Sequence, residues 1–212
     1  MPNLSAVDAV RDGHPLVEEA RALAERLLGR QGTRWQHTHG VAARAGTATA
    51  AVPAPHRSVL LAAAWLHDIG YAEALHRSQF HPLNGAWHLQ TLGHDPLVVG
   101  LVAHHSGSRF IAAEIGLTPL LAPFDNPQYT EGPLADALTY ADQTTGPHGQ
   151  LMNVDDRLTE MLTRHGADSP NARCHPRRAP ALRAAVHRTQ QRLGVTTATQ
   201  AGERPTPQPR GT

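Results

Sequence analysis

Apolar residues recur at helical spacing along most of the chain, and Pro or Gly interrupts the pattern between segments. Residues 14–29 place Leu16, Ala20 and Leu23 on one face, which predicts a helix that ends at a glycine. Similar patterns predict helices at 35–51, 58–66, 81–92, 96–104, 110–116, 133–142, 153–165 and 180–193. Residues 118–132 contain several prolines and predict an irregular loop. No segment alternates convincingly as a strand does, so we expect an all-α fold.

The length and the composition of the C-terminus suggest how the chain is organised. A chain of 212 residues fits one domain with a sizeable core. From residue 194 onward the sequence is rich in Thr, Gln, Pro and Gly, which is typical of a disordered tail. We therefore expect a single domain over residues 1–193, with a core at about 30–165, C-terminal helices up to about 193, and a tail at 194–212.

Charge and cysteine content exclude several classes of function. The net charge is only +1, so no field for binding nucleic acid is expected. The single cysteine, Cys174, allows no internal disulfide and fits a reducing compartment. Neither a signal-peptide pattern nor an apolar run long enough for a membrane span is visible, so a cytoplasmic protein is expected.

Histidine is unusually frequent, with 15 residues, and a subset of these fits a metal site. Metal sites need nitrogen and oxygen ligands that converge from different elements. The candidates lie near predicted helix ends or in helices rich in small residues, and they are His37 or His39, His67, Asp68, His81, His104, His105 and Asp142. That placement suits a cluster between packed helices.

The positions of Asp68 and Asp142 are an independent reason to expect a bound cation. Both follow the C-terminal part of a predicted helix, where the helix dipole is negative and disfavours a carboxylate. A bound cation would reverse the sign of that local field. The alternative for each aspartate is a capping role or a pair with an arginine.

Helical geometry restricts the histidine pairs. His37 and His39 point to roughly opposite helix faces, so only one of them can face the cluster. His104 and His105 differ by about 100° around a helix, so either or both could reach a two-metal centre.

Five segments in order resemble the HD-domain metal-dependent phosphohydrolase superfamily. They are RWQHTHGVAARA, AAAWLHDIGY, QFHPLNGAWHL, LVAHHSG and LTYADQTTG, and the resemblance covers roughly residues 30–165. It implies an all-α HD-domain helical bundle with a metal site between its helices. Matching the motifs residue by residue implies ligands at His37, His67, Asp68, His81, His104 or His105 or both, and Asp142.

The extra histidines resemble those of two-metal members of the superfamily. The resemblance therefore implies a binuclear centre in which Asp68 bridges the ions and helps to activate water. Iron or manganese fits the mixed nitrogen and oxygen ligands, with zinc and magnesium as alternatives. The implied activity is hydrolysis of a phosphoester or phosphoanhydride, most naturally that of a nucleotide. Arg34, Arg77 and Arg109 could bind the phosphate of this small substrate, or could lie on the surface.

Two other functions stay open at this point. Some HD proteins with the same ligands are mixed-valent di-iron oxygenases, which carry Tyr and an acidic residue shortly before the first histidine. Here Arg30, Gln31, Thr33 and Arg34 occupy those positions. The second alternative is a non-catalytic nucleotide-binding module. The sequence does not indicate the oligomeric state.

Overall fold

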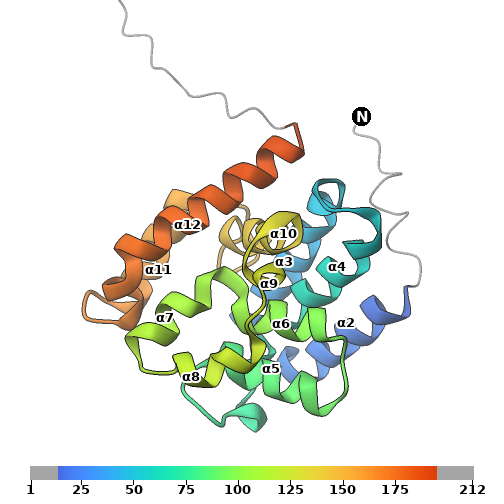
Figure 1. Ribbon diagram of the computed structural model, residues 1–212, viewed down its shortest axis with the longest axis horizontal. Helices are drawn as coiled ribbons and strands as arrows, with labels where there is room; N and C mark the ends of the chain where they lie inside the picture. The colour runs from blue at the N-terminus through green and yellow to red at the C-terminus, as the bar shows by residue number, and fades with distance from the viewer. Residues whose placement is uncertain (1–13, 195–212) are drawn as a thin grey trace, which may run out of the picture.

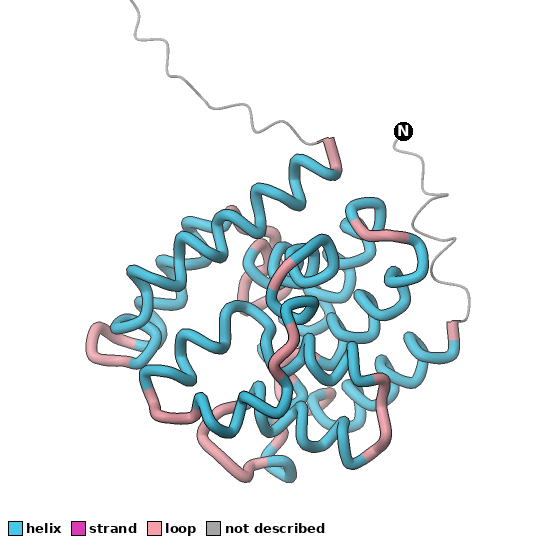
Figure 2. Tube along the Cα trace, viewed as in Figure 1, coloured by secondary structure: helices cyan, strands magenta, loops and turns pink. Residues whose placement is uncertain are grey.

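Helices dominate residues 14–194, the part of the chain that the computed structural model describes (Figure 2). In chain order they are α2 (Pro15–Leu28), α3 (Thr33–Ala48), α4 (Arg57–Leu66), α5 (His81–Thr91), α6 (Pro96–His104), α7 (Ser108–Glu114), α8 (Thr118–Leu121), α9 (Pro127–Thr130), α10 (Gly132–Gln143), α11 (Val154–His165) and α12 (Pro170–Arg192). Between residues 14 and 194 the only β-pairing is an isolated bridge between Thr145 and Leu151. The fold is all-α, as predicted.

Helix α4 forms the centre of the bundle. It packs against α2, α3, α6 and α10 (Figure 1). Leu60, Ala62, Ala63, Ala64 and Leu66 on this helix are completely buried. The alanines let neighbouring helices approach closely, and the C-terminal end of α4 therefore lies among them rather than at the surface.

The C-terminal helices pack on α10. Helix α12 crosses α10 and lies beside α11 (Figure 1). The carboxylate of Asp136 in α10, which is 1% exposed, pairs with Arg188 at 2.5 Å and with Arg192 at 2.8 Å. Residues beyond the predicted core thus contact the helix that carries Asp142.

Two predictions about elements are wrong. Residues 118–132 contain the short helices α8 and α9, each with proline in its first turn, where the missing N–H costs nothing. Helix α12 begins at Pro170 instead of Pro180 and contains Pro176 and Pro180. Its buried face, which includes Cys174, compensates for the backbone hydrogen bonds that the two prolines remove.

Most other predicted helices agree with the observed bounds to within a few residues. The Asp95 side chain caps α6, because its Oδ1 accepts a hydrogen bond from the Leu97 amide at 2.8 Å. The predicted tail lies outside the described residues, apart from Gly194. Within residues 14–194, every helix is too short or too polar to cross a bilayer.

Candidate metal centre

Six of the predicted ligands form two adjacent groups of three. The first group is His37, His67 and Asp142, and the second is Asp68, His81 and His105. Within each group, one possible ligand atom from every residue lies within 4.8 Å of the others. Five of the six residues are buried, and His81 is half-buried.

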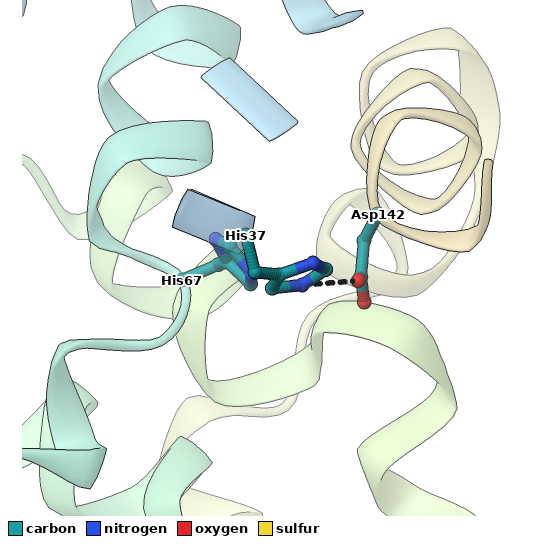
Figure 3. Close-up of side chains that lie close together, drawn as sticks. All are labelled: His37, His67 and Asp142. Atoms are coloured by element: carbon teal, nitrogen blue, oxygen red, sulfur yellow. Dashed lines mark hydrogen bonds and ion pairs between the residues drawn. The ribbon is translucent and has the colours of Figure 1, made fainter. Parts of the chain in front are cut away.

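Helix ends bring these side chains together. Residues His67 and Asp68 directly follow α4, and Asp142 lies in the last turn of α10. His81 is the first residue of α5, and His105 follows α6. Figure 3 shows the first group, in which the rings of His37 and His67 lie near the carboxylate of Asp142.

Three backbone carbonyls determine which ring nitrogen of three histidines carries the proton. The pairs are His37 Nδ1 with Gly146 O at 3.1 Å, His67 Nδ1 with Ala64 O at 2.8 Å, and His105 Nδ1 with Val102 O at 2.7 Å. A carbonyl can only accept, so each Nδ1 must donate. In the neutral ring the Nε2 lone pair is then free, which is how ligand histidines are held in metal sites.

The atoms that face one another in this cluster could hold a cation between them. His67 Nε2 is buried and has no hydrogen-bond partner. His37 Nε2 lies 3.0 Å from Asp142 Oδ1, so a lone pair would face a carboxylate oxygen (Figure 3). A transition-metal ion satisfies such a set of imidazole and carboxylate donors, and the residues present fit it.

Asp68 lies between the two groups. Its Oδ2 atom is 3.3 Å from His67 Nε2 and 3.8 Å from His37 Nε2. Its Oδ1 atom is 3.3 Å from His81 Nε2 and 3.7 Å from His105 Nε2. Each oxygen of one carboxylate thus faces a different group, which is the arrangement that a bridging ligand requires.

Electrostatics keep both carboxylates ionised. Burial alone would raise the pKa of Asp68, but the charges of Arg34 and His67 hold it well below its usual range. Burial likewise opposes ionisation of Asp142, but the neighbouring His37, His67 and Arg157 together hold its pKa well below its usual range. Two buried negative charges therefore lie within one cluster, and they favour a bound cation.

Burial keeps two histidines of the second group neutral. It lowers the pKa of His105 to about 3 and also lowers the pKa of His81. For His67, burial is the largest single influence and lowers the pKa, but the charge and hydrogen bond of Asp68 together with the charge of Asp142 and the Ala64 carbonyl shift it upward overall. In the protein without metal, a proton on His67 Nε2 would occupy the place where a metal ion would otherwise bind.

Neighbouring side chains orient the carboxylates. Arg34 forms a hydrogen-bonded ion pair with Asp68, and its guanidinium lies 4.0 Å above the Tyr71 ring. Ser106 donates a hydrogen bond to Asp142 Oδ2, and Gln143 Nε2 donates to the same oxygen at 3.0 Å. The sequence reasoning missed Ser106 and Gln143, although both lie directly beside predicted ligands.

A cavity of about 580 Å³ opens onto the cluster, and arginines form part of its wall. These are Arg34, Arg157, Arg164 and Arg178. Of the four, only Arg34 was among the predicted phosphate-binding residues. Helical spacing could have revealed Arg157, because it lies three residues after Val154 and four before Met161 on the apolar face of α11.

Four candidates lie outside the two groups. His39 is exposed, with its ring 5.6 Å from the Trp65 ring. His104 Nε2 lies 3.1 Å from the Phe124 carbonyl, because α6 ends at His104 and the chain then turns. Arg77 and Arg109 are exposed and border two other cavities.

No family model, curated protein or solved structure matches this chain.

Proposed function

We propose that this protein is a metal-dependent phosphohydrolase of the HD type, with a binuclear centre that acts on a phosphoester or phosphoanhydride, most naturally of a nucleotide. The observation that carries the proposal is the position of Asp68, with one carboxylate oxygen toward each ligand group. Two ions held there would lower the pKa of a water molecule and neutralise charge on a phosphoryl group.

The chain's own residues prepare the site for this chemistry. The carbonyls of Gly146, Ala64 and Val102 fix three rings with Nε2 inward. Arg34 holds the Asp68 carboxylate and borders the cavity, where its other N–H groups can bind a phosphoryl oxygen. Iron or manganese suits the four imidazoles and two carboxylates, with zinc and magnesium as alternatives.

The arginines favour hydrolysis of a phosphate over the alternative functions. A di-iron oxygenase could use the same six ligands, but it has no general need for four guanidinium groups around the substrate. Guanidinium groups match phosphate oxygens in charge and geometry. A non-catalytic binding module would not need Asp68 placed between two complete ligand groups.

Phosphate release after metal reconstitution tests the proposal. The protein is stripped of metal, reloaded separately with Mn²⁺, Fe²⁺, Zn²⁺ or Mg²⁺, and offered nucleoside mono-, di- and triphosphates and dinucleoside polyphosphates. We expect metal-dependent release from at least one substrate, and Asp68→Ala should lower the rate by about 100-fold or more.

Asp125→Ala is the matched control, because this exposed carboxylate lies 3.2 Å from His104 and outside both ligand groups. It should retain the rate of the unmodified protein. Absence of release with every metal and substrate, or equal loss in the two variants, would contradict the proposal. Substrate-dependent O₂ uptake by the iron-loaded protein would instead favour the oxygenase.

A further inference from the structure

Helices α11 and α12 contribute three arginines to the wall of the cavity that holds the cluster. Arg157 and Arg164 lie on α11, and Arg178 lies on α12. None of the three is needed to complete the two ligand groups. Arg178 also lies beyond the segments that carry the HD resemblance, so its presence here requires an explanation of its own.

Arg178 is a buried cation without a carboxylate partner. It is 6% exposed, and none of the acidic side chains of residues 14–194 forms an ion pair with it. Its Nε donates to the Ser106 carbonyl at 2.9 Å, and its Nη1 donates to Asn171 Oδ1 at 3.1 Å. Arginine has five N–H donors, and no described residue accepts a hydrogen bond from Nη2. A buried charge of this kind is costly unless an anion pairs with it.

Arg157, on the other helix, is buried as well and is only partly paired. Its side chain is 4% exposed, and its Nε is buried without a hydrogen-bond partner. It shares Glu160 with Arg164, while Asp142, 3.8 Å from its Nη2, already accepts hydrogen bonds from Ser106 and Gln143. Arg157 and Arg164 thus share one carboxylate that is not a candidate metal ligand, and Arg178 pairs with none.

These arginines adjoin the metal ligands. Arg178 binds the carbonyl of Ser106, and the hydroxyl of the same serine binds Asp142. Only one residue therefore separates the buried guanidinium from a ligand of the first group. An anion held by the arginines would lie beside a phosphoryl group placed at the metals.

We infer that Arg157, Arg164 and Arg178 form a subsite for a second phosphate group, so that the substrate carries at least two phosphates close together. A diphosphate or a longer phosphoanhydride fits this arrangement, and a simple phosphomonoester leaves Arg178 without an anionic partner. The inference rests on the proposed function for the position of the first phosphate. If Arg178 only braced the turn at Ser106, a second phosphate would add no affinity through it.

Binding of two non-hydrolysable ligands tests the subsite without catalysis. Methylphosphonate carries one anionic group and methylenediphosphonate carries two. Affinities are measured by calorimetry with Mn²⁺ in excess of protein and ligand, so that chelation in solution is the same for every variant. We expect the diphosphonate to bind at least about tenfold more tightly than methylphosphonate, since charge-assisted hydrogen bonds are the strong ones.

Two variants report on the subsite, and one serves as control. Arg178→Gln and Arg164→Gln should each weaken diphosphonate binding, by about tenfold for the buried Arg178, and leave methylphosphonate binding unchanged. Arg164 is 37% exposed, so its variant should keep the fold even if Arg178→Gln does not. Arg183→Gln, on an exposed part of α12 and paired with Asp155, should leave both affinities unchanged.

The outcomes separate the subsite from the metal centre. Equal affinity of the unmodified protein for the two ligands, or an unchanged preference in both subsite variants, would overturn the subsite. Methylphosphonate binding that does not depend on Mn²⁺ would count against the proposed metal centre. In that case a diphosphonate preference that disappears in the arginine variants would still support the subsite.

Discussion

At the residue scale, two pairs of adjacent residues contribute differently to the cluster: both members of one pair belong to it, but only one member of the other pair does. His67 and Asp68 leave the end of α4 toward different ligand groups, so adjacent positions serve both halves of the cluster. His104 and His105 separate instead, because α6 ends at His104 and the two rings bind different carbonyls, those of Phe124 and Val102. Only the second histidine of that pair reaches Asp68.

Alanine substitutions of this pair should therefore differ in metal content. His105→Ala removes one ligand of the second group and should lower metal content by about one ion per chain. His104→Ala loses the hydrogen bond to Phe124 and should cost about 1–3 kcal/mol of folding free energy, but it should keep all bound metal. Elemental analysis and thermal unfolding of both variants measure these effects. Equal metal loss in the two variants would contradict this assignment.

The candidate ligands could be predicted from the sequence more completely than the residues that surround them. Ligand types at characteristic spacings were visible in the motifs, and the structure brings six of those residues together. Arg77 and Arg109 were considered because they lie near the motifs in sequence, yet both are exposed. Helical spacing places Arg157 on the buried face of α11, but that this face and Arg178 of α12 line the cavity follows only from the packing of the two helices.

At the element scale, Gly40 allows α3 to lie against the loop that follows α10. A Cβ atom at Gly40 would lie 2.6 Å from Gly149 Cα and 2.8 Å from Gly149 O, which leaves no room for a side chain. The same loop supplies the Gly146 carbonyl that orients His37. Close packing of this helix and loop therefore positions a predicted ligand.

Two glycines in α3 form a matched test of this contact. Gly40→Ala should destabilise the fold by about 1–3 kcal/mol, because the loop must move away from the helix. Gly46→Ala meets nothing within 4 Å and should stabilise the helix by about 0.5–1 kcal/mol. Chemical denaturation measures both values. If Gly40→Ala were as stable as Gly46→Ala, the loop would not be held in this way.

Amphipathic helices were easier to predict from the sequence than helices that contain proline. Amphipathic spacing located α2 and α11 correctly, because one face of each packs on the core. Prolines were interpreted as breaks, and this missed α8, α9 and the first half of α12. Packing of α12 against the rest of the bundle allows the helix to contain prolines. The local sequence does not reveal these packing contacts.

At the scale of the whole molecule, the cluster joins helices that are distant in sequence. Its ligands extend from His37 in α3 to Asp142 in α10, so bound metal would hold together most of the bundle. Without metal, compensation of the buried Asp68 and Asp142 carboxylates falls to Arg34 and to neighbouring histidines, and burial opposes protonation of His67. Metal binding should therefore contribute directly to stability.

Removal of metal should lower the melting temperature. Metal at about 100 times its dissociation constant contributes about 2.7 kcal/mol, which corresponds to about 5–10 °C for a domain of this size. Calorimetry before and after chelation, with metal removal verified by elemental analysis, measures the shift. Readdition of metal should restore the original value. An unchanged melting temperature after complete removal would count against a structural contribution of the metals.

The most direct test of the binuclear centre is the metal content of the purified protein and of Asp68→Ala. The position of Asp68 between the two groups predicts about two transition-metal ions per chain in the unmodified protein. Because one carboxylate would serve both ions in the proposed centre, its removal should lower the content to one ion or fewer. A protein that binds no metal after incubation with Fe²⁺, Mn²⁺ or Zn²⁺, or an Asp68→Ala variant that still holds two ions, would contradict the account.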